Sequence, residues 1–102
     1  LRIFWGSFFT IYFYNMKKIL FADQVRAVVR SIPKGQMMTY GAVAKVAGYP
    51  GAARAVGVVL KNNYDKTVPC HRVIRADGKL GEYNRGGSNT KRKLLTAEGA
   101  IL

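Results

Sequence analysis

Residues 39–63 read TYGAVAKVAGYPGAARAVGVVLKNN, and this stretch decides the fold because it encodes two short helices around a tight turn. Thr39 is a good N-cap, since its hydroxyl can accept a hydrogen bond from a free amide of the first helical turn. The first helix is expected over residues 40–47 and ends before Gly48, which can adopt the left-handed conformation. A second helix is expected over residues 52–61. Together they predict a helix-turn-helix.

The second helix of this unit has two different faces. Val56, Val59 and Leu60 have the spacing of a buried face. The other face is small and consists of Ala52, Ala53, Ala55 and Gly57. A small face lets a helix approach another surface closely, and the residues leave open whether that surface is a neighbouring helix or a DNA groove. Arg54 is the long cation on this face, and its residue type alone fits a solvent-exposed arginine equally well.

A longer amphipathic helix is predicted before the helix-turn-helix. Between residues 20 and 32 the apolar residues recur at helical spacing, which places one face in the core; they are Phe21, Val25, Val28, Val29 and Ile32. Arg26 and Arg30 are expected to face outward. The sequence Pro-Lys-Gly at residues 33–35 ends this helix.

A strand, a turn and a helix are expected after the helix-turn-helix. Residues 72–75 predict a strand, and Ala-Asp-Gly at 76–78 is typical of a hairpin turn leading to a return strand at 79–80. Ser88 or Asn89 is expected to cap a last helix that reaches about Glu98. The predicted fold class is therefore mainly α with a small β-hairpin, in a winged-helix-like layout.

The first fifteen residues differ in character from the rest. They are aromatic and aliphatic, Arg2 is their only charge, and they are too few to span a membrane. Lys17 and Lys18 follow the apolar run, whereas a secretory signal places basic residues before it. Met16 is typical of a protein start. We therefore expect residues 1–15 to be an apolar extension outside the fold, with a signal anchor as the alternative, and residues 16–102 to form the domain.

The bulk composition favours a nucleic-acid partner. The chain has 102 residues, enough for one modest core, and 49% of them are hydrophobic, which excludes a disordered chain. Lys and Arg number 17 against 5 Asp and Glu, a net charge of +12, which favours a polyanion. A single cysteine cannot form an internal disulfide, and structural zinc would need more Cys or His than the chain has.

The sole cysteine and the sole histidine are adjacent in Pro69-Cys70-His71-Arg72-Val73. A cysteine attacks as its thiolate and needs a base or a positive charge nearby, which His71 and Arg72 could supply. Taken by itself, a lone cysteine is also typical of a small buried packing residue.

Four other fragments accompany this motif in a fixed order. They are Thr39-Tyr40-Gly41, then Ala53-Arg54-Ala55-Val56-Gly57 running on to Asn63, then Gly81-Glu82-Tyr83, and then residues 94–99, LLTAEG. Over about residues 20–100 the set resembles the DNA-binding, active-site domain of the O6-alkylguanine-DNA alkyltransferases. The resemblance implies a protein that binds the minor groove of double-stranded DNA containing O6-alkylguanine, flips the damaged base out and transfers its alkyl group once, without a cofactor.

The same resemblance implies roles for individual residues. Cys70 would be the nucleophile, His71 its base acting through a water, and Glu98 the group that holds His71. Asn63 would brace the active-site loop. DNA contacts would come from Thr39, Tyr40, Ala53, Arg54 and Gly57, with Arg54 replacing the flipped nucleotide. Tyr40 would also belong to the catalytic set, because it can hydrogen-bond the flipped guanine. Residues expected around the alkylguanine are Cys70 and Val73 through their backbone, Tyr83, Asn84, Arg85 and Lys91.

Two departures from the family pattern leave alternatives open. Alkyltransferases usually carry a further N-terminal domain that this sequence does not show, and Asn84-Arg85 before Gly86-Gly87 lengthens the pocket loop by a residue. Alkyltransferase-like sensors share the compact domain but replace the acceptor cysteine, so Cys70 favours transfer over sensing. A generic basic winged-helix protein with an inert Cys70 is the third reading. We expect a monomer without membrane contact, located in the cytoplasm, or at the nucleoid in a bacterium or archaeon.

Overall fold

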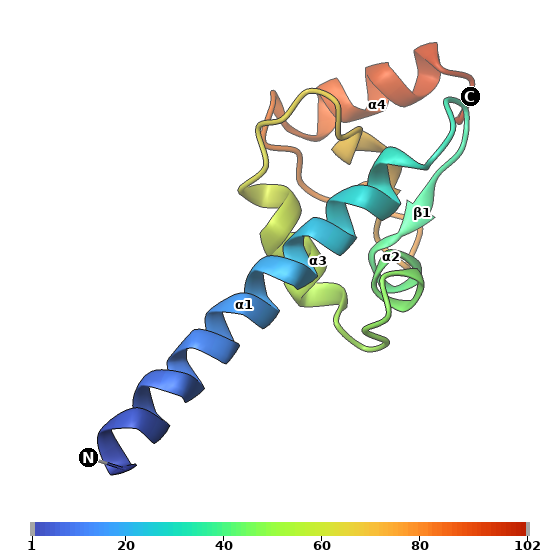
Figure 1. Cartoon of the computed structure of the whole chain (residues 1–102). Coiled ribbons are helices and arrows are strands. Elements are labelled where there is room, and N and C mark those ends of the chain that lie inside the picture. The colour runs from blue at the N-terminus through green and yellow to red at the C-terminus, as the bar shows by residue number, and fades with distance from the viewer. Residues whose placement is uncertain (1, 102) are drawn as a thin grey trace.

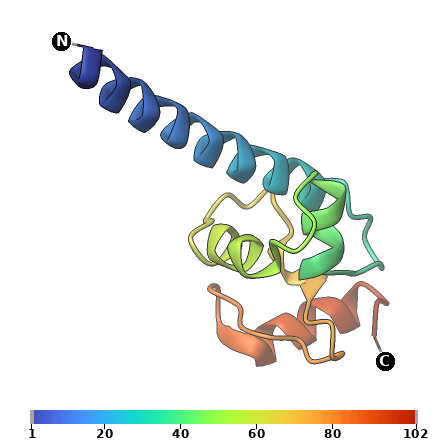
Figure 2. The ribbon, with the colours of Figure 1, turned by 90° about the horizontal axis from the view of Figure 1, so that it is seen from below.

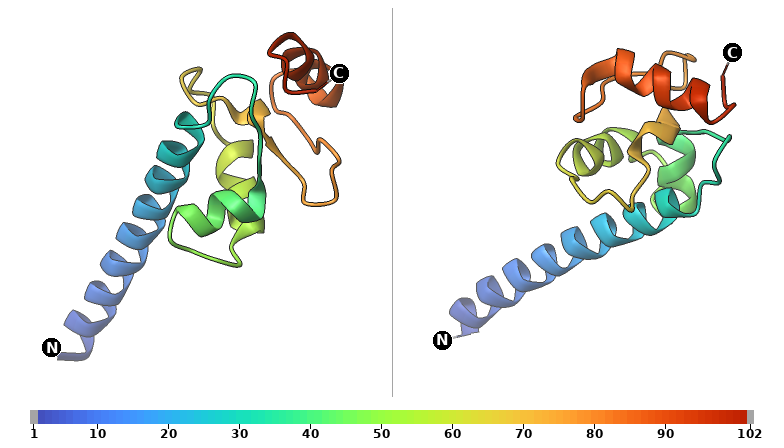
Figure 3. Two further views of the ribbon diagram at one scale, coloured as in Figure 1. Left: turned by 90° about the vertical axis from the view of Figure 1, so that its right-hand side faces the viewer. Right: turned by 90° about the horizontal axis from the view of Figure 1, so that it is seen from above.

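Helices in three layers make up most of residues 2–101, whose backbone the computed structural model describes, with side chains described from residue 16 to 101. Helix α1 (Arg2–Arg30) lies on one side, α2 (Tyr40–Val46) and α3 (Ala53–Lys61) lie in the middle, and α4 (Gly87–Ala97) lies on the other side (Figures 1 and 2). The views of Figure 3 agree with this order. Two short strands and a 3-10 turn connect the layers.

Helix α1 buries the predicted face. Val25, Val28, Val29 and Ile32 are at most 9% exposed and join the core formed with α2 and α3. The Phe21 ring is partly buried and meets the Tyr49 ring edge-to-face, with centroids 4.9 Å apart. The helical backbone continues back to Arg2, and Figure 1 shows this N-terminal half standing clear of the other elements. The side chains of residues 1–15 lie outside the described set, so their place outside the domain stays a prediction.

The predicted helix-turn-helix is confirmed. The Thr39 hydroxyl accepts a hydrogen bond from the Ala42 amide at 3.1 Å, and Gly48 adopts a φ of +94° just beyond the helix. The packing side chains on the facing surfaces of the two helices are buried; they are Val43, Ala44, Ala47, Val56 and Leu60. The mainly helical fold class therefore follows from the local signals of residues 39–61.

The β-hairpin of the predicted wing is not formed. Strand β2 (Val73–Ile74) instead pairs in parallel with β1 (Met38–Thr39), in the register Met38 to Val73. The predicted turn is present, because the Arg75 amide donates to the Lys79 carbonyl at 3.0 Å, but no return strand follows it within residues 2–101. Gly81, two residues after Lys79, has a φ of +77°, which lies outside the range of an extended strand.

Helix α4 begins earlier than predicted and without a side-chain cap. Its first residue is Gly87, and the preceding Gly86 has a φ of +121°, a conformation that favours glycine. A Cβ on Gly86 would lie 2.6 Å from the Thr90 hydroxyl oxygen, which donates a hydrogen bond to the Gly86 carbonyl. Leu95 is buried as predicted, whereas Leu94 is only partly covered. Within the described residues, every helix is too short or too polar to span a membrane.

Candidate functional site around Cys70

Cys70 opens a single turn of 3-10 helix, η1 (Cys70–Arg72), that leads directly into β2. Its side chain is 6% exposed and belongs to the main core, yet it also forms part of the wall of a cleft of about 510 Å³. The cleft lies between α3 and the loop after β2; its wall includes Tyr40, Arg54, Gly57, Tyr83 and Asn84. The structure therefore places Cys70 in the wall of a cleft large enough for a nucleobase.

Asn63 supports the sulfur directly. Its amide Nδ2 lies 3.3 Å from the Cys70 Sγ and 3.2 Å from the Asp65 carbonyl, and the residue is 5% exposed. Burial raises the pKa of the Cys70 thiol, and the Asn63 hydrogen bond and the charges of Arg85 and Lys91 oppose this only in part. The thiol is therefore protonated at rest, and its proton has to leave when the sulfur reacts.

His71, Glu98 and Arg72 form one network beside the thiol. The predicted contact is confirmed: His71 Nε2 lies 3.0 Å from Glu98 Oε1 although 27 residues separate them. Arg72 donates to both carboxylate oxygens of Glu98, at 3.1 and 2.7 Å, and to the Ile32 carbonyl at 2.8 Å. These bonds, Arg72 foremost, lower the pKa of Glu98 to about 2. Arg72 was expected to assist the thiol, but the structure commits its guanidinium to holding Glu98.

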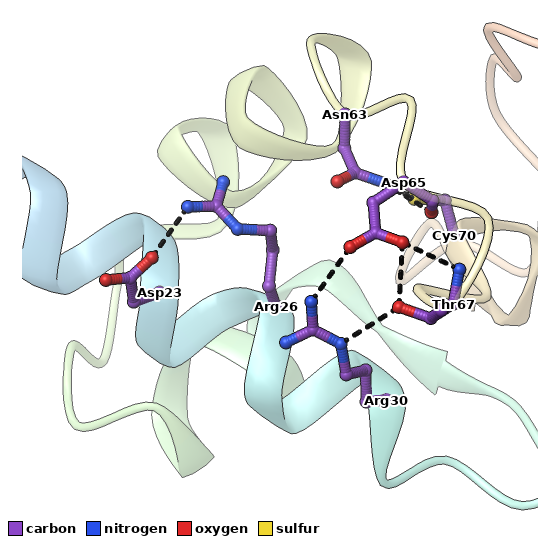
Figure 4. Close-up of polar contacts among 7 residues, drawn as sticks. All are labelled: Asp23, Arg26, Arg30, Asn63, Asp65, Thr67 and Cys70. Carbon is purple, nitrogen blue, oxygen red and sulfur yellow. Dashed lines mark hydrogen bonds and ion pairs between the residues drawn. The ribbon is translucent and has the colours of Figure 1, made fainter.

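A second network ties α1 to the loop before Cys70 (Figure 4). Arg30 donates to Asp65 Oδ2 at 3.0 Å and to the Thr67 hydroxyl at 3.3 Å. Asp65 in turn accepts hydrogen bonds from the amide and the hydroxyl of Thr67, at 2.9 and 2.7 Å. These bonds with Thr67 lower the pKa of Asp65. The sequence predicted Arg30 only as an outward residue, and nothing in its spacing indicated this partner.

The residues predicted to contact DNA lie on or beside one surface. Tyr40, Ala53, Arg54 and Gly57 line a shallow depression of about 540 Å³ that shares Tyr40, Arg54 and Gly57 with the Cys70 cleft. Arg54 is exposed, so its side chain is available at the edge of both. Thr39 serves as the N-cap of α2 beside this surface. Val58, 59% exposed, also lines the Cys70 cleft and was not predicted to belong to the site.

The residues predicted around an alkylated base divide into two groups. Tyr83 and Asn84 line the Cys70 cleft, as does Tyr40, whose pKa is raised chiefly by burial. The other three, Val73, Lys91 and Arg85, do not line it: the Val73 and Lys91 side chains are buried, and Arg85 lines a separate cleft. Two adjacent residues of the loop, Asn84 and Arg85, therefore line different clefts.

Asn84 clamps the pocket loop to the end of α3. Its Nδ2 lies 2.8 Å from the Lys61 and Asn63 carbonyls and 3.3 Å from the Leu60 carbonyl. The last carbonyls of a helix lack partners within the helix, so a side-chain donor from outside completes its C-terminus. Through Asn63, this clamp also connects the pocket loop to the bond that Asn63 makes with the Cys70 sulfur.

Lys91 is the fully buried cation of the site. Its Nζ donates to the Leu80 carbonyl and lies 3.5 Å from the Glu82 carbonyl and 5.7 Å from the centre of the Tyr40 ring. Burial lowers its pKa to about 8. The ammonium therefore fixes the loop after the β2 turn and places a positive charge behind the thiol. No group of three or more His, Cys, Asp or Glu side chains that could hold a metal occurs in the described part of the chain.

A helix-turn-helix whose second helix borders a cleft with a buried cysteine, beside a histidine-glutamate pair, defines a known class. Residues 20–100 match the family described as 6-O-methylguanine DNA methyltransferase, DNA binding domain, and the chain belongs to this family. The resemblance seen in the sequence is confirmed. A methylated-DNA–protein-cysteine methyltransferase of Methanothermobacter thermautotrophicus is 46% identical over 80 residues, covering 78% of this chain and 44% of that protein. A DNA base-flipping protein of Vibrio parahaemolyticus is 46% identical, covering 78% and 79%.

Solved structures give the same result. Mycobacterium tuberculosis OGT in complex with DNA is 47% identical with a TM-score of 0.73, over 78% of this chain and 50% of that one. Schizosaccharomyces pombe Atl1 in complex with damaged DNA containing O6-carboxymethylguanine is 34% identical with a TM-score of 0.69, over 78% and 75%. This chain spans between 35% and 47% of the length of three curated methyltransferases that it matches.

Proposed function

We propose that this protein repairs DNA by transferring the alkyl group of an O6-alkylguanine in duplex DNA to Cys70, once per molecule and without a cofactor. The observation that carries the proposal is the cleft of about 510 Å³ that joins the Cys70 sulfur to the exposed Arg54 on α3. A base extruded beside α3 would enter this cleft and reach the sulfur. Family membership supports the same reading.

The proposed reaction is a single displacement. The Cys70 sulfur forms a bond to the alkyl carbon as the bond from that carbon to guanine O6 breaks, and the departing guanine keeps the electron pair and takes up a proton at N1 from solvent. The thiol proton passes to His71, through a water in the family scheme. Because ionised Glu98 is bound to Nε2, the neutral imidazole carries its proton there and leaves Nδ1 as the acceptor.

The surrounding groups support this step. The positive charges of Arg85 and Lys91 favour the developing thiolate, and Asn63 donates a hydrogen bond to it. Tyr40 stays protonated because burial raises its pKa, so its hydroxyl can donate a hydrogen bond to the bound base. The product is a thioether that water does not cleave, which limits each molecule to one reaction.

DNA binding is assigned to α3 and its surroundings. We propose that α3 lies in the minor groove, whose edges carry little sequence information, as suits a protein that has to search any sequence. Extruding a base costs a few kcal/mol, and the exposed guanidinium of Arg54 would fill the space left in the stack. Ala53 and Gly57, on the same surface, allow the close approach that this requires.

The second candidate function is a sensor that binds O6-alkylguanine and recruits excision repair without accepting the alkyl group. The chain covers 79% of the Vibrio base-flipping protein and 75% of the Atl1 chain, a far larger share than of the longer methyltransferases. Cys70 favours transfer over sensing, because it lines the cleft and its sulfur lies within hydrogen-bond distance of the Asn63 amide.

One experiment separates these functions. The protein is incubated with a duplex oligonucleotide containing O6-methylguanine, and its intact mass is measured. Gain of a single methyl group in the wild type but not in Cys70→Ala supports transfer. Tight and selective binding of the methylated duplex with no mass gain supports the sensor. Equal affinity for methylated and plain duplex, with no gain in mass, would overturn both and leave a generic DNA-binding protein.

A further inference from the structure

A second cleft adjoins the cysteine segment on the side away from α3. Its volume is about 500 Å³, and Tyr83 is the only residue that it shares with the Cys70 cleft. Residues 66–69 and the His71-Arg72 pair form one wall, and Arg30, Arg85 and Leu94 complete it. None of the roles proposed above for DNA or for the alkylated base uses this space.

The walls of this cleft carry an unbalanced positive charge. They include Arg30, Lys66, Arg72 and Arg85 but no aspartate or glutamate. Arg30 is paired with Asp65, and Arg72 with Glu98. Lys66 and Arg85, by contrast, make no ion pair with any carboxylate among residues 16–101. A concave surface lined by charge of one sign concentrates the electric field and attracts ions of the opposite sign.

Arg85 has a hydrogen-bond donor that the protein leaves unsatisfied. Its Nη2 atom is enclosed by protein and has no hydrogen-bond partner in the described part of the chain, whereas the residue as a whole is partly exposed. A guanidinium that is partly removed from water without an acceptor is costly, and a charged partner on its open edge would offset that cost. The planar fork of an arginine matches the oxygens of a phosphate group in particular.

We propose that the cleft lined by Arg85, Lys66 and His71 binds an oxyanion of the phosphate type, with Arg85 as the anchor. The phosphate group has two sources, a free phosphate ion or the backbone of a nucleic-acid strand. The recognition chemistry is the same for both: two cations without an ion pair line a cleft whose lining includes no aspartate or glutamate.

Occupancy would act on the cysteine, an effect that rests on the proposed function. The positive charge of Arg85 is among the influences that lower the pKa of the Cys70 thiol. An anion bound to Arg85 would neutralise part of that influence and make the thiolate harder to form. Phosphate is therefore expected to slow alkyl transfer to Cys70 from a free O6-alkylguanine base.

The binding test needs no transfer activity, so its failure and that of the proposed function are distinguishable. Inorganic phosphate is titrated into the full chain at constant ionic strength, and the His71 ring resonances are followed by NMR. Arg85→Gln is expected to weaken phosphate binding about tenfold, the effect of one charge-assisted hydrogen bond. Lys93→Gln removes the same charge from an exposed position of α4 and should leave the affinity unchanged. Equal weakening in both variants, or no saturable shift in the wild type, would overturn the site.

Two further arms complete the test. Lys66→Gln, at an exposed position, replaces Arg85→Gln if the latter fails to fold, and it too should weaken phosphate binding more than Lys93→Gln. Competition with an undamaged duplex identifies the source of the phosphate group. If a nucleic-acid backbone is the occupant, the duplex competes with phosphate and Arg85→Gln lowers duplex affinity. If a free ion is the occupant, duplex affinity is the same in both proteins; both results support a phosphate-type site.

Discussion

Replacing Glu98 with glutamine tests the network that orients His71. The substitution keeps the shape of the side chain and removes its charge. In the wild type the carboxylate accepts two bonds from Arg72, at 3.1 and 2.7 Å, and lies 3.0 Å from His71 Nε2. The side chain is only 12% exposed, so water can replace these partners only in part. The glutamine oxygen can keep the bonds made to one carboxylate oxygen but not to both, and the Arg72 charge loses its counter-ion.

The pKa of Glu98 sets the size of the expected effect. It falls from 4.5 to about 2 on folding, which corresponds to roughly 3 kcal/mol of stability, or about 2 kcal/mol after allowing for residual solvent. Because the folded-state pKa is the lower one, this stability is fully present above pH 4.5 and is lost as the pH falls toward 2. At pH 7 the variant should therefore melt about 10 °C below the wild type.

Urea unfolding and thermal melts between pH 7 and pH 3 measure the difference. The gap between wild type and Glu98→Gln should be widest at neutral pH and shrink as the pH falls below 4.5. Asp23→Asn is the control, since Asp23 is 62% exposed in a surface pair with Arg26. This substitution should change the free energy of unfolding by less than about 0.5 kcal/mol. A gap below that value at pH 7, or one that does not narrow in acid, would refute the reasoning.

Three further substitutions probe the rest of the site. Asn84→Ala removes the donor shared by three carbonyls and should cost about 1–3 kcal/mol in urea unfolding, and unchanged stability would contradict the clamp. Arg54→Ala should slow repair of duplex while leaving the reaction with free O6-alkylguanine intact, and equal losses on both would remove Arg54 from base flipping. Lys91→Met should cost about 1–3 kcal/mol of stability, because the Leu80 carbonyl loses its donor, and should raise the pKa of Cys70, seen as a shift to higher pH of its alkylation by iodoacetamide; an unshifted profile would sink the electrostatic role of Lys91.

Local signals in the sequence were enough to predict the helix-turn-helix. Thr39 caps its helix as expected, and Gly48 ends it, because both effects act within one turn of chain. The contact between His71 and Glu98 was predicted by family resemblance, since no local rule relates residues so far apart. The roles assigned to these residues in DNA repair stay predictions until the mass experiment is done.

The errors arise where the partner of a residue is chosen by the tertiary fold. The alternation in residues 72–75 indicated a strand, and residues 73–74 do form one. It could not show that this strand pairs with Met38 and Thr39 instead of a return strand. Arg72 and Asn84 bind backbone carbonyls, which every residue carries, so sequence offers no pattern for such partners. The partner of Arg30 is also set by the tertiary fold, because its bond to the Asp65 carboxylate depends on where α1 crosses the loop.

The parallel pairing of β1 with β2 affects how the chain folds. The whole helix-turn-helix lies between the two strands in sequence, so the strands pair only after that long loop has closed. The contact between Glu98 and His71, in the turn that begins at Cys70, is a second contact of long sequence separation. Contacts of such long sequence separation slow folding. During synthesis on the ribosome the Cys70 turn would therefore remain unassembled until α4 emerges, and the Cys70 sulfur and α3 would reach their final positions in one cooperative step.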